Sequence, residues 1–307
     1  MIEFDIVPQG PFSWPAAVDV LRTFPPLQRH WRGQHDSLPL TFLLDGDFTP
    51  VSAVLGDAGG RITCLGSGTT DVQRFKAQVA RIFSLDRDGA GYPAVLQRDA
   101  RLAPIAAALP GLRPVCFTSP YECAAWAVMS QRISMRQTAT ALSHVLEEHG
   151  HGLTAGNQEV MCFPEPERLL KIQTIPGLNS QKVDRLHGVA RAALAGILDA
   201  NRLRTMAPEE AAELLRTIPG IGPFWASGIY LRAAGISDVF PAEPLSIAAL
   251  GRLHGLGDRP APEDIDRLTS AYRPFRMWVC FLLRVAADRG LIPGVNGREG
   301  AIRRAAA

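Results

Sequence analysis

Hydrophobic and polar positions follow two different patterns along this chain. Up to about residue 110, apolar runs at 38–44 and 61–65 are separated by Asp- and Gly-rich turns, which predicts two strands. A short helix is predicted at 15–22, and residues 72–83 return to a helical period. The apolar positions of that second helix share one face: Val72, Phe75, Val79 and Ile82. This part of the chain is therefore predicted to be a mixed α/β unit.

From Ser119 onward the pattern is helical throughout, and we expect no strands there. Pro120 lies at a predicted helix start, and several later helices also begin with a proline, whose missing N–H costs little at the first helical position. Gly235 and Gly290 are predicted helix ends. Further helices are predicted at 166–172, 180–195, 208–217, 223–234, 244–253, 261–272 and 276–289.

The most informative segment joins two of these helices. Residues 214–226 read Leu-Leu-Arg-Thr-Ile-Pro-Gly-Ile-Gly-Pro-Phe-Trp-Ala. Gly220 and Gly222 lack the Cβ that would keep a phosphate away from the backbone, and the start of the following helix adds the favourable end of its dipole. The turn Gly220-Ile221-Gly222 therefore predicts a contact with a nucleic-acid backbone that ignores base sequence. The alternative is an ordinary tight connection between two packed helices.

Composition and charge limit the classes of function. The chain has 307 residues, of which 47% are hydrophobic and 20% charged, an ordinary globular composition. Its net charge is only +2, so a nucleic-acid contact must come from local placement of charge. The N-terminus lacks the pattern of a secretory signal, and no apolar run approaches the roughly 20 residues that span a bilayer. We therefore expect a cytoplasmic protein with no membrane partner.

Cysteine and histidine positions bear on metals and disulfides. The five cysteines are scattered and form no Cys-x-x-Cys pair, which predicts reduced thiols and excludes a four-cysteine iron–sulfur loop. Three histidines lie close to Glu147 and Glu148: His144, His149 and His151. Their spacing is not that of a zinc site, and we interpret them as the solvated end of a helix stopped at Gly150 and Gly152. We expect no metal site.

Six short motifs follow one another along the chain. They are Phe83-Ser84-Leu85-Asp86, Leu109-Pro110-Gly111-Leu112-Arg113, Ser130-Gln131-Arg132-Ile133-Ser134, Ile175-Pro176-Gly177-Leu178 with Lys182, the hairpin at 218–226, and Asp238-Val239-Phe240-Pro241. In this order they resemble the bacterial DNA-3-methyladenine glycosylase II family, which is part of the helix-hairpin-helix DNA glycosylase superfamily. The resemblance covers nearly the whole chain.

The resemblance implies an α+β fold. It places a small TBP-like α/β N-terminal domain at 1–112, an all-helical glycosylase core at 113–295 with the helix-hairpin-helix at 210–234, and a loose basic tail at 296–307. It also implies a monofunctional DNA N-glycosylase of base excision repair. Such an enzyme rotates an alkylated base out of duplex DNA and hydrolyses its bond to the sugar. The implied partner is double-stranded DNA, bound by a monomer.

The family motifs assign roles to individual residues. The implied DNA-binding residues are Gln131, Arg132, Gly220, Ile221 and Gly222, and the implied base pocket contains Phe224 and Phe275. Arg132 would fill the gap left by the flipped base, since a guanidinium can stack on bases. The aromatic faces suit a positively charged N-alkylated purine. Taken without the resemblance, Arg132 is a surface residue on a loop, and aromatic residues at helical spacing, such as Trp225 and Trp278, belong to the core.

The catalytic carboxylate is where the sequence departs from the family. The family implies an Asp six residues after Asp238, and this chain has Pro244 there. Glu243 lies one position earlier, at a predicted helix start, and its longer side chain makes it our candidate for the anion that stabilises an oxocarbenium-like sugar. Two alternatives remain: Glu243 is a plain helix-start anion, or the protein binds lesions without hydrolysing them. Asp238 itself matches a structural position.

Two further expectations follow from the hairpin. Phe224 occupies the position where bifunctional relatives place a lysine nucleophile, so the resemblance implies an enzyme that leaves the DNA strand intact. The resemblance also implies that carbonyls of the hairpin hold a monovalent cation beside a phosphate. No organic cofactor is expected.

Overall fold

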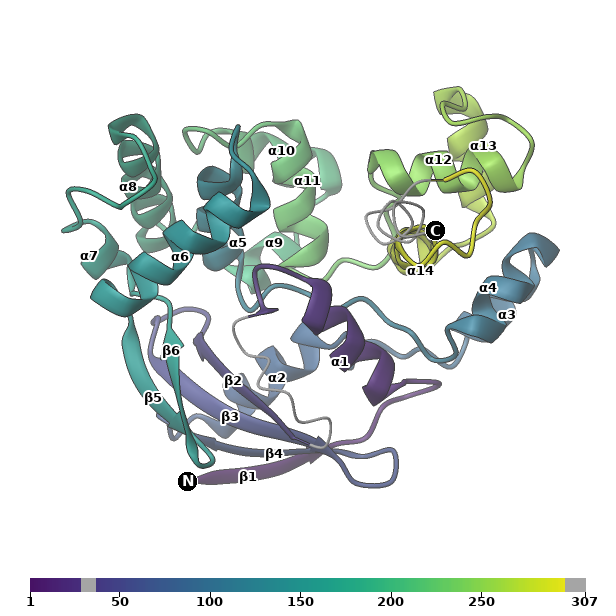
Figure 1. Cartoon of the computed structure of the whole chain (residues 1–307). Coiled ribbons are helices and arrows are strands. Elements are labelled where there is room, and N and C mark those ends of the chain that lie inside the picture. Colours follow the sequence, from purple (N-terminus) through teal and green to yellow (C-terminus); the bar gives the residue numbers. More distant parts are fainter. Residues whose placement is uncertain (29–36, 296–307) are drawn as a thin grey trace, which may run out of the picture. The chain divides into compact units, whose positions relative to one another are not determined.

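The computed structural model describes residues 1–28 and 37–295 (Figure 1). Its contacts divide the chain into two units. The first unit comprises Met1–Val7, Val18–Asp86 and Val115–Gly235, and the second comprises Pro8–Ala17, Arg87–Pro114 and the chain from Ile236 on. The helix α1 (Trp14–Thr23) contributes residues to both. The predicted tail at 296–307 lies outside the described residues.

The first unit contains a four-stranded antiparallel sheet. Its strands are β1 (Ile2–Ile6), β2 (Ser37–Leu43), β3 (Pro50–Asp57) and β4 (Ile62–Ser67), in the order β1-β4-β3-β2. The helix α2 (Val72–Ile82) buries Phe75 against the sheet, where its ring packs against those of Phe4 and Phe42. Gly66 of β4 makes room for this ring, because a Cβ at Gly66 would lie 2.1 Å from it.

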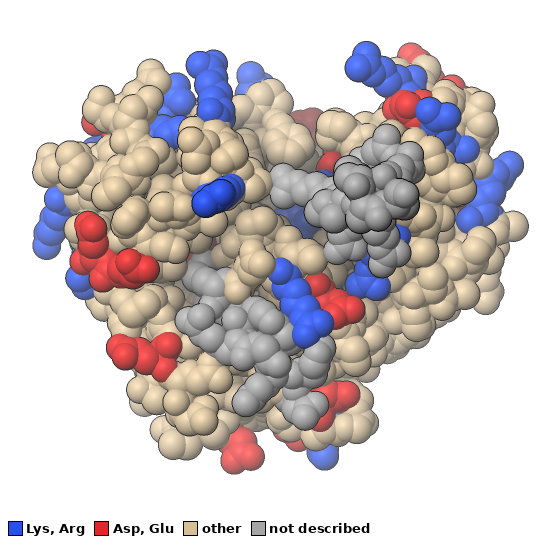
Figure 2. Space-filling model, viewed as in Figure 1, with Lys and Arg blue, Asp and Glu red and all other residues tan. Residues whose placement is uncertain are grey.

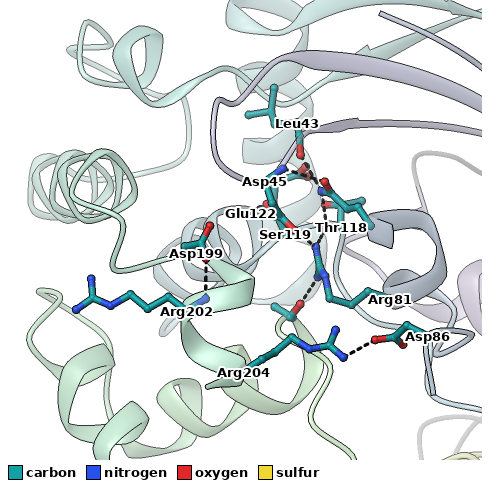
Figure 3. Close-up of polar contacts among 12 residues, drawn as sticks. Leu43, Asp45, Arg81, Asp86, Thr118, Ser119, Glu122, Asp199, Arg202 and Arg204 are labelled. Carbon is teal, nitrogen blue, oxygen red and sulfur yellow. Dashed lines mark hydrogen bonds and ion pairs between the residues drawn. The ribbon is translucent and has the colours of Figure 1, made fainter. Parts of the chain in front are cut away.

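A buried polar network joins this sheet to the helices of the first unit (Figure 3). The guanidinium of Arg81, on α2, pairs with Asp45 and donates to the carbonyl oxygens of Thr118 (3.0 Å) and Ala233. Ala233 directly follows α11 (Pro223–Arg232), so one side chain holds both the sheet and the end of this helix. Burial raises the pKa of Asp45, against the opposing effect of the Arg81 charge.

A second sheet of two strands occurs later in the chain, between two helices. Its strands are β5 (His151–Ala155) and β6 (Gln158–Cys162). The hydroxyl of Ser52, on β3, donates to the carbonyl oxygen of Thr154 (2.7 Å) and ties this hairpin to the first sheet. The expectation of no strands after Ser119 is therefore wrong, because strands of five residues are too short for a clear alternation. Gly150 ends the preceding helix as predicted, whereas Gly152 lies within β5.

The helix α5 (Pro120–Ser130) forms the centre of the helical part of the first unit. Every one of its residues is buried, which agrees with its mostly apolar side chains, although Glu122 is charged. The helices α6, α8 and α11 pack against it. The further helices of this unit are α6 (Met135–His149), α7 (Pro166–Leu169), α8 (Ser180–Leu194), α9 (Ala200–Arg204) and α10 (Pro208–Arg216).

The second unit is helical in the part that the structure describes. It contains α3 (Tyr92–Gln97), a 3-10 helix (Ala100–Leu102), α4 (Ala103–Ala108), α12 (Pro244–Leu253), α13 (Pro262–Ser270) and α14 (Arg276–Asp288). Its core holds an aromatic cluster of Tyr92, Phe275 and Trp278, with ring centroids 4.8 to 5.3 Å apart. The buried guanidinium of Arg113 lies over the Trp278 ring, 5.0 Å from its centroid.

Asp99 is the centre of a buried polar network in the second unit. Its carboxylate accepts hydrogen bonds from the hydroxyl of Tyr272 (2.7 Å) and from the backbone N–H of Arg101 (3.1 Å), and it pairs with the ring of His254 at 2.9 Å. Burial alone raises the pKa of Asp99, but these partners outweigh burial and lower the pKa below its ordinary value.

The α+β fold class predicted from the sequence is confirmed. Every helix predicted after residue 119 is present, with ends that differ by a few residues, whereas β1 and β3 were missed. The domain boundary at 112 stays a prediction, and the contacts group residues 87–114 with the C-terminal helices. All five cysteines are free and buried. Among the described helices, none combines the length and apolar character needed to cross a bilayer.

Candidate nucleic-acid interface and catalytic site

The predicted helix-hairpin-helix is formed by α10, the turn 217–222 and α11. Ile218 and Ile221 are buried, and the N–H of Ile221 donates to the carbonyl of Ile218 (3.0 Å), which closes the turn. Gly220 has a φ of +91°, a value that favours glycine. Gly222 is the N-cap of α11. A Cβ added at Gly222 would have no described atom within 4 Å. No side chain of the described residues caps the first amides of α11, which fits the predicted phosphate contact.

The predicted duplex-filling residue lies between α5 and α6, on residues 131–133, which we call the plug turn. Arg132 is exposed and has a φ of +56°, which is uncommon for a residue with a side chain. Its guanidinium makes no hydrogen bond or ion pair with any residue that the structure describes. Ser134 and Gln137 then begin α6 with reciprocal capping bonds of 3.2 and 2.9 Å. The plug turn therefore presents an Arg side chain that its surroundings do not occupy.

The side chain of Gln131 connects the plug turn to the hairpin. Its Nε2 donates to the carbonyl oxygen of Gly220 (2.6 Å), and its Oε1 accepts from Nη1 of Arg185 on α8 (3.2 Å). Lys182, one turn earlier on α8, donates from Nζ to the carbonyl oxygen of Met129 (2.6 Å), near the end of α5. Burial lowers the pKa of Lys182, and the charge of Arg185 lowers it further. The plug turn and the hairpin turn therefore lie side by side.

Charge on this face is distributed unevenly. Figure 2 shows Lys and Arg side chains gathered over the upper part of the first unit, around α5 and α8, while acidic side chains lie lower, towards β5 and β6. Three basic side chains lie at or beside the plug turn: Arg132, Lys182 and Arg185. Local placement of this kind suits a phosphate backbone.

Phe224 and Trp225 follow the hairpin on the first turn of α11. Phe224 is 56% exposed, and its ring lies edge-on to that of Trp225, with centroids 5.5 Å apart and planes at 80°. An exposed aromatic face beside a turn that is predicted to contact phosphate is suited to stacking on a base. Trp225, predicted to belong to the core, is half-buried.

Glu243 is the N-cap of α12, and its carboxylate is held at both oxygens. Oε2 accepts from the backbone N–H and the hydroxyl of Ser246, both at 2.7 Å, and Oε1 accepts from Nη1 of Arg284 on α14 (2.9 Å). The side chain is 20% exposed. Pro244, at the position of the family's Asp, is the first residue of the helix. The result is a carboxyl group with a fixed position at a helix start.

The other candidates of the second unit lie in or near its aromatic cluster. Phe275 is 5% exposed and packs against Tyr92 and Trp278, and its contact with a base stays a prediction. Trp278 is a core residue, as predicted. Asp238 accepts a hydrogen bond from Nε of Arg276 (2.7 Å), and its carbonyl accepts a second from the same guanidinium. This fits the structural position expected of Asp238.

Comparison with known proteins agrees with this geometry, although no family model matches the sequence. The chain is 22% identical to a DNA-3-methyladenine glycosylase of Bacillus subtilis over 206 residues, which cover 66% of this chain and 68% of the relative. It is 28% identical to DNA-3-methyladenine glycosylase 2 of Escherichia coli over 221 residues, or 71% and 72% of the two chains. The solved 3-methyladenine DNA-glycosylase from Archaeoglobus fulgidus has the same fold, with a TM-score of 0.75 and 20% identity over 92% of this chain and 98% of that one. The chain is thus similar in sequence to DNA-3-methyladenine glycosylases and shares the fold of the solved one.

The predicted site residues form two groups in the structure. The first unit brings together the plug turn, the hairpin turn and Phe224, and the second unit holds Glu243 and Phe275. Sequence reasoning missed Arg284 and Ser246. Ser246 could have been found, because it stands three residues after the N-cap, where capping partners occur. Arg284 is 41 residues from Glu243 along the chain, and no local pattern predicts their pairing.

Side chains that could ligate a metal are scattered over the described part of the chain. No three His, Cys, Asp or Glu side chains form a metal-binding group within residues 1–28 and 37–295. The histidines near the end of α6 have acidic partners instead: His149 lies 3.7 Å from Glu148, and His151 pairs with Glu165.

Proposed function

We propose that this chain is a monofunctional DNA N-glycosylase of base excision repair, which removes alkylated bases from duplex DNA by hydrolysis. The observation that carries the proposal is the pair of adjacent turns in the first unit. The start of α11 has no capping side chain among the described residues and lies beside the plug turn. Among the described residues, Arg132 of the plug turn has no hydrogen-bond or ion-pair partner. Uncapped amides at a helix start bind anions, and an exposed guanidinium stacks on bases. The relatives' names, which specify 3-methyladenine, support an alkylated base as the substrate.

Binding begins at the hairpin. The amides of Gly222 and of the first turn of α11 contact one backbone phosphate, and this contact depends on no base. A monovalent cation held by hairpin carbonyls would add positive charge beside the phosphate. The carbonyls of Ile218 and Gly220 each accept one hydrogen bond and retain a second lone pair for such a cation. Arg132 then enters the duplex and replaces the flipped nucleotide, which lowers the cost of keeping it outside.

Aromatic faces hold the flipped base. Phe224 offers an exposed ring, and Phe275 belongs to the aromatic cluster of the second unit. An N-alkylated purine carries positive charge, and a π face attracts such a charge by about 0.5 to 2 kcal/mol, depending on desolvation. An undamaged, neutral base gains less from the same rings. The rings therefore favour alkylated bases over normal ones.

Hydrolysis requires an anion near the sugar. When the N-glycosidic bond breaks, its electron pair leaves with the base, which becomes neutral, and the sugar becomes oxocarbenium-like. Glu243 supplies a fixed negative charge, because Ser246 and Arg284 hold its two oxygens. A water molecule then adds to the anomeric carbon and gives up a proton, which leaves an abasic site. With Phe224 at the position of the lysine nucleophile, no Schiff base forms and the strand stays intact.

A base-release assay tests the proposal. Purified protein is incubated with methylated duplex DNA, and free 3-methyladenine is measured for the wild type, Glu243→Gln and Glu263→Gln. Glu263 is a matched control, because it is an exposed acid in the first turn of α13. We expect release by the wild type and by Glu263→Gln, and a loss of roughly 100-fold or more for Glu243→Gln with unchanged DNA affinity. Full activity of Glu243→Gln would refute the role of this carboxylate, and no release by the wild type from a panel of alkylated bases would refute the enzyme.

A second candidate function is a lesion-binding protein without hydrolysis. It is favoured by Pro244 at the expected Asp position and by the Arg284 charge, which offsets that of Glu243. Tight binding of alkylated or abasic duplexes together with no released base would identify it. The same assay, combined with a gel-shift measurement, therefore separates the two functions.

A further inference from the structure

We infer that Gln131 is a positioning residue, which fixes the plug turn to the hairpin turn and so sets where Arg132 enters the duplex relative to the bound phosphate. Its role in DNA repair rests on the proposed function. The competing hypothesis is the one predicted from the sequence, in which Gln131 contacts DNA directly.

Two protein contacts fix the orientation of the Gln131 amide. Its Nε2 donates to the carbonyl oxygen of Gly220 at 2.6 Å, and its Oε1 accepts from Arg185 at 3.2 Å. Both ends of the amide are therefore engaged with protein atoms from two other segments. One N–H and one lone pair of the amide remain, but Gly220 and Arg185 set its orientation. Gln131 thus acts as a crosslink between segments 89 residues apart in sequence.

The segment that Gln131 fixes has an unusual backbone. Arg132, its neighbour, has a φ of +56°. A residue with a side chain keeps a left-handed conformation only where the surrounding structure determines it. Here Gln131 holds the turn on one side, and the capping box of Ser134 and Gln137 holds it on the other. The exposed Arg132 side chain is thereby projected from a backbone that is fixed at both ends.

The hairpin turn is held in place by α8, through Arg185. A Cβ on Gly220 would lie 2.9 Å from Cδ of Arg185, so the glycine lets this side chain lie against the turn while it bonds Gln131. On the preceding turn of α8, Lys182 bonds the carbonyl of Met129. The helix α8 therefore supports the end of α5 and the hairpin turn together, and Gln131 completes the connection between them.

Alignment of the two turns has a functional consequence. The amides beside Gly220 set the position of the phosphate, and Arg132 must reach a gap at a fixed distance from it. Holding two groups in the productive arrangement removes the entropy that each encounter would otherwise cost. Loss of the Gln131 crosslink should therefore weaken binding to a flipped lesion while leaving binding to undamaged DNA, which uses the hairpin phosphate contact alone, nearly unchanged.

Two variants separate the hydrogen bonds. Gln131→Met has a similar length but neither donor nor acceptor, and Gln131→Glu keeps an acceptor for Arg185 while losing the donor to Gly220. Gln181, an exposed residue in the first turn of α8, provides the matched controls Gln181→Met and Gln181→Glu. Circular dichroism establishes that each variant is folded.

The first measurement is hydrogen exchange of the free protein by mass spectrometry. We expect both Gln131 variants to raise exchange in peptides that cover 131–134 and 219–222 by about threefold to tenfold, which corresponds to roughly 0.7 to 1.4 kcal/mol. The Gln181 controls should not change it. The inference would be overturned if Gln131→Met exchanged as the wild type does. It would also be overturned if only Gln131→Glu exchanged as the wild type does, because the bond to Gly220 would then contribute nothing.

The second measurement is the ratio of affinities for an abasic duplex and an undamaged duplex. We expect this ratio to fall about threefold to tenfold in Gln131→Met, and to fall no further when Gln131→Met is added to Arg132→Ala, because Gln131 acts through Arg132. An equal fall in the Arg132→Ala background would identify Gln131 as a direct DNA contact and overturn the positioning role. If the wild type releases no base while exchange and affinity ratio change as expected, the proposed enzyme fails and the positioning role stands.

Discussion

The starts of α11 and α12 share an N-terminal proline and differ in the N-cap residue before it. Each helix opens with proline after an N-cap, in Gly222-Pro223 and Glu243-Pro244. Glycine brings no side chain, so within the described residues the first amides of α11 remain open to an anion from outside. Glutamate folds back on its own helix and accepts the N–H of Ser246. The comparison teaches that the N-cap residue decides whether a helix start binds a ligand or its own side chain.

The largest expected effect comes from closing the open helix start. Gly222→Asp places a carboxylate where the phosphate binds, at a backbone conformation that any residue can adopt. We expect DNA affinity to fall more than about 100-fold, since like charges brought together cost several kcal/mol. The thermal midpoint should be unchanged or higher, because Asp is a good N-cap. Gel shifts and thermal denaturation measure the two effects.

The control for this variant is Gly222→Ser, which caps the helix without charge. Its DNA affinity should lie between those of the wild type and Gly222→Asp. If Gly222→Asp binds DNA as tightly as the wild type, the start of α11 is not the phosphate site, and the contrast with α12 loses its functional meaning.

An intermediate effect is expected at the closed helix start. Ser246 is fully buried, and its hydroxyl donates to Glu243 at 2.7 Å. Ser246→Ala should lower the free energy of unfolding by about 1 to 3 kcal/mol and slow base release about tenfold, since Glu243 loses one of the groups that fix it. Urea denaturation and the base-release assay measure these changes, with Ser270→Ala, an exposed serine of α13, as the control. Unchanged stability and rate would mean that the backbone N–H of residue 246 and Arg284 position Glu243 without the hydroxyl.

The smallest expected effect is on the pH dependence of stability, where a carboxylate of the second unit, Asp99, is compared with one of the first unit, Asp45. The pKa of Asp99 is lowered in the folded protein, so its contribution to stability is present above the unfolded pKa of about 3.9 and is lost as pH falls through the folded pKa. Asp45 has a raised pKa and the opposite sign, with a contribution that is present below about pH 3.9 and lost as pH rises through its folded pKa. Denaturation between pH 7 and 3 should therefore show a shallower acid loss for Asp99→Asn and a steeper one for Asp45→Asn. Parallel curves for both variants and the wild type would contradict these signs.

Local signals made the hairpin and most helix starts predictable. Gly220 and Gly222 indicate the turn because no other residue leaves that backbone as open, and Pro120, Pro208, Pro223 and Pro244 mark helix starts that the structure confirms. Glu243 was recognised as a helix-start anion, and it is the N-cap of α12. These features depend on neighbours within a few residues, which a sequence displays directly.

Features that depend on distant partners could not be predicted. The pairing of Glu243 with Arg284 and the crosslink from Gln131 to Gly220 join segments 41 and 89 residues apart. The strands β5 and β6 are recognisable only once the first sheet is present for them to pack on. In each case tertiary contacts, rather than local preference, determine the conformation.

The buried cysteines have a consequence for the conditions in which this protein would work. The thiolate is the form of cysteine that reacts with alkylating agents. Burial raises the pKa of the Cys64 thiol to about 12, and it also raises the pKa values of Cys116 and Cys123. These sulfur atoms therefore stay protonated and shielded from methylating chemicals at neutral pH. A protein that repairs methylation damage would thus keep its own nucleophiles out of reach of the agents that cause it.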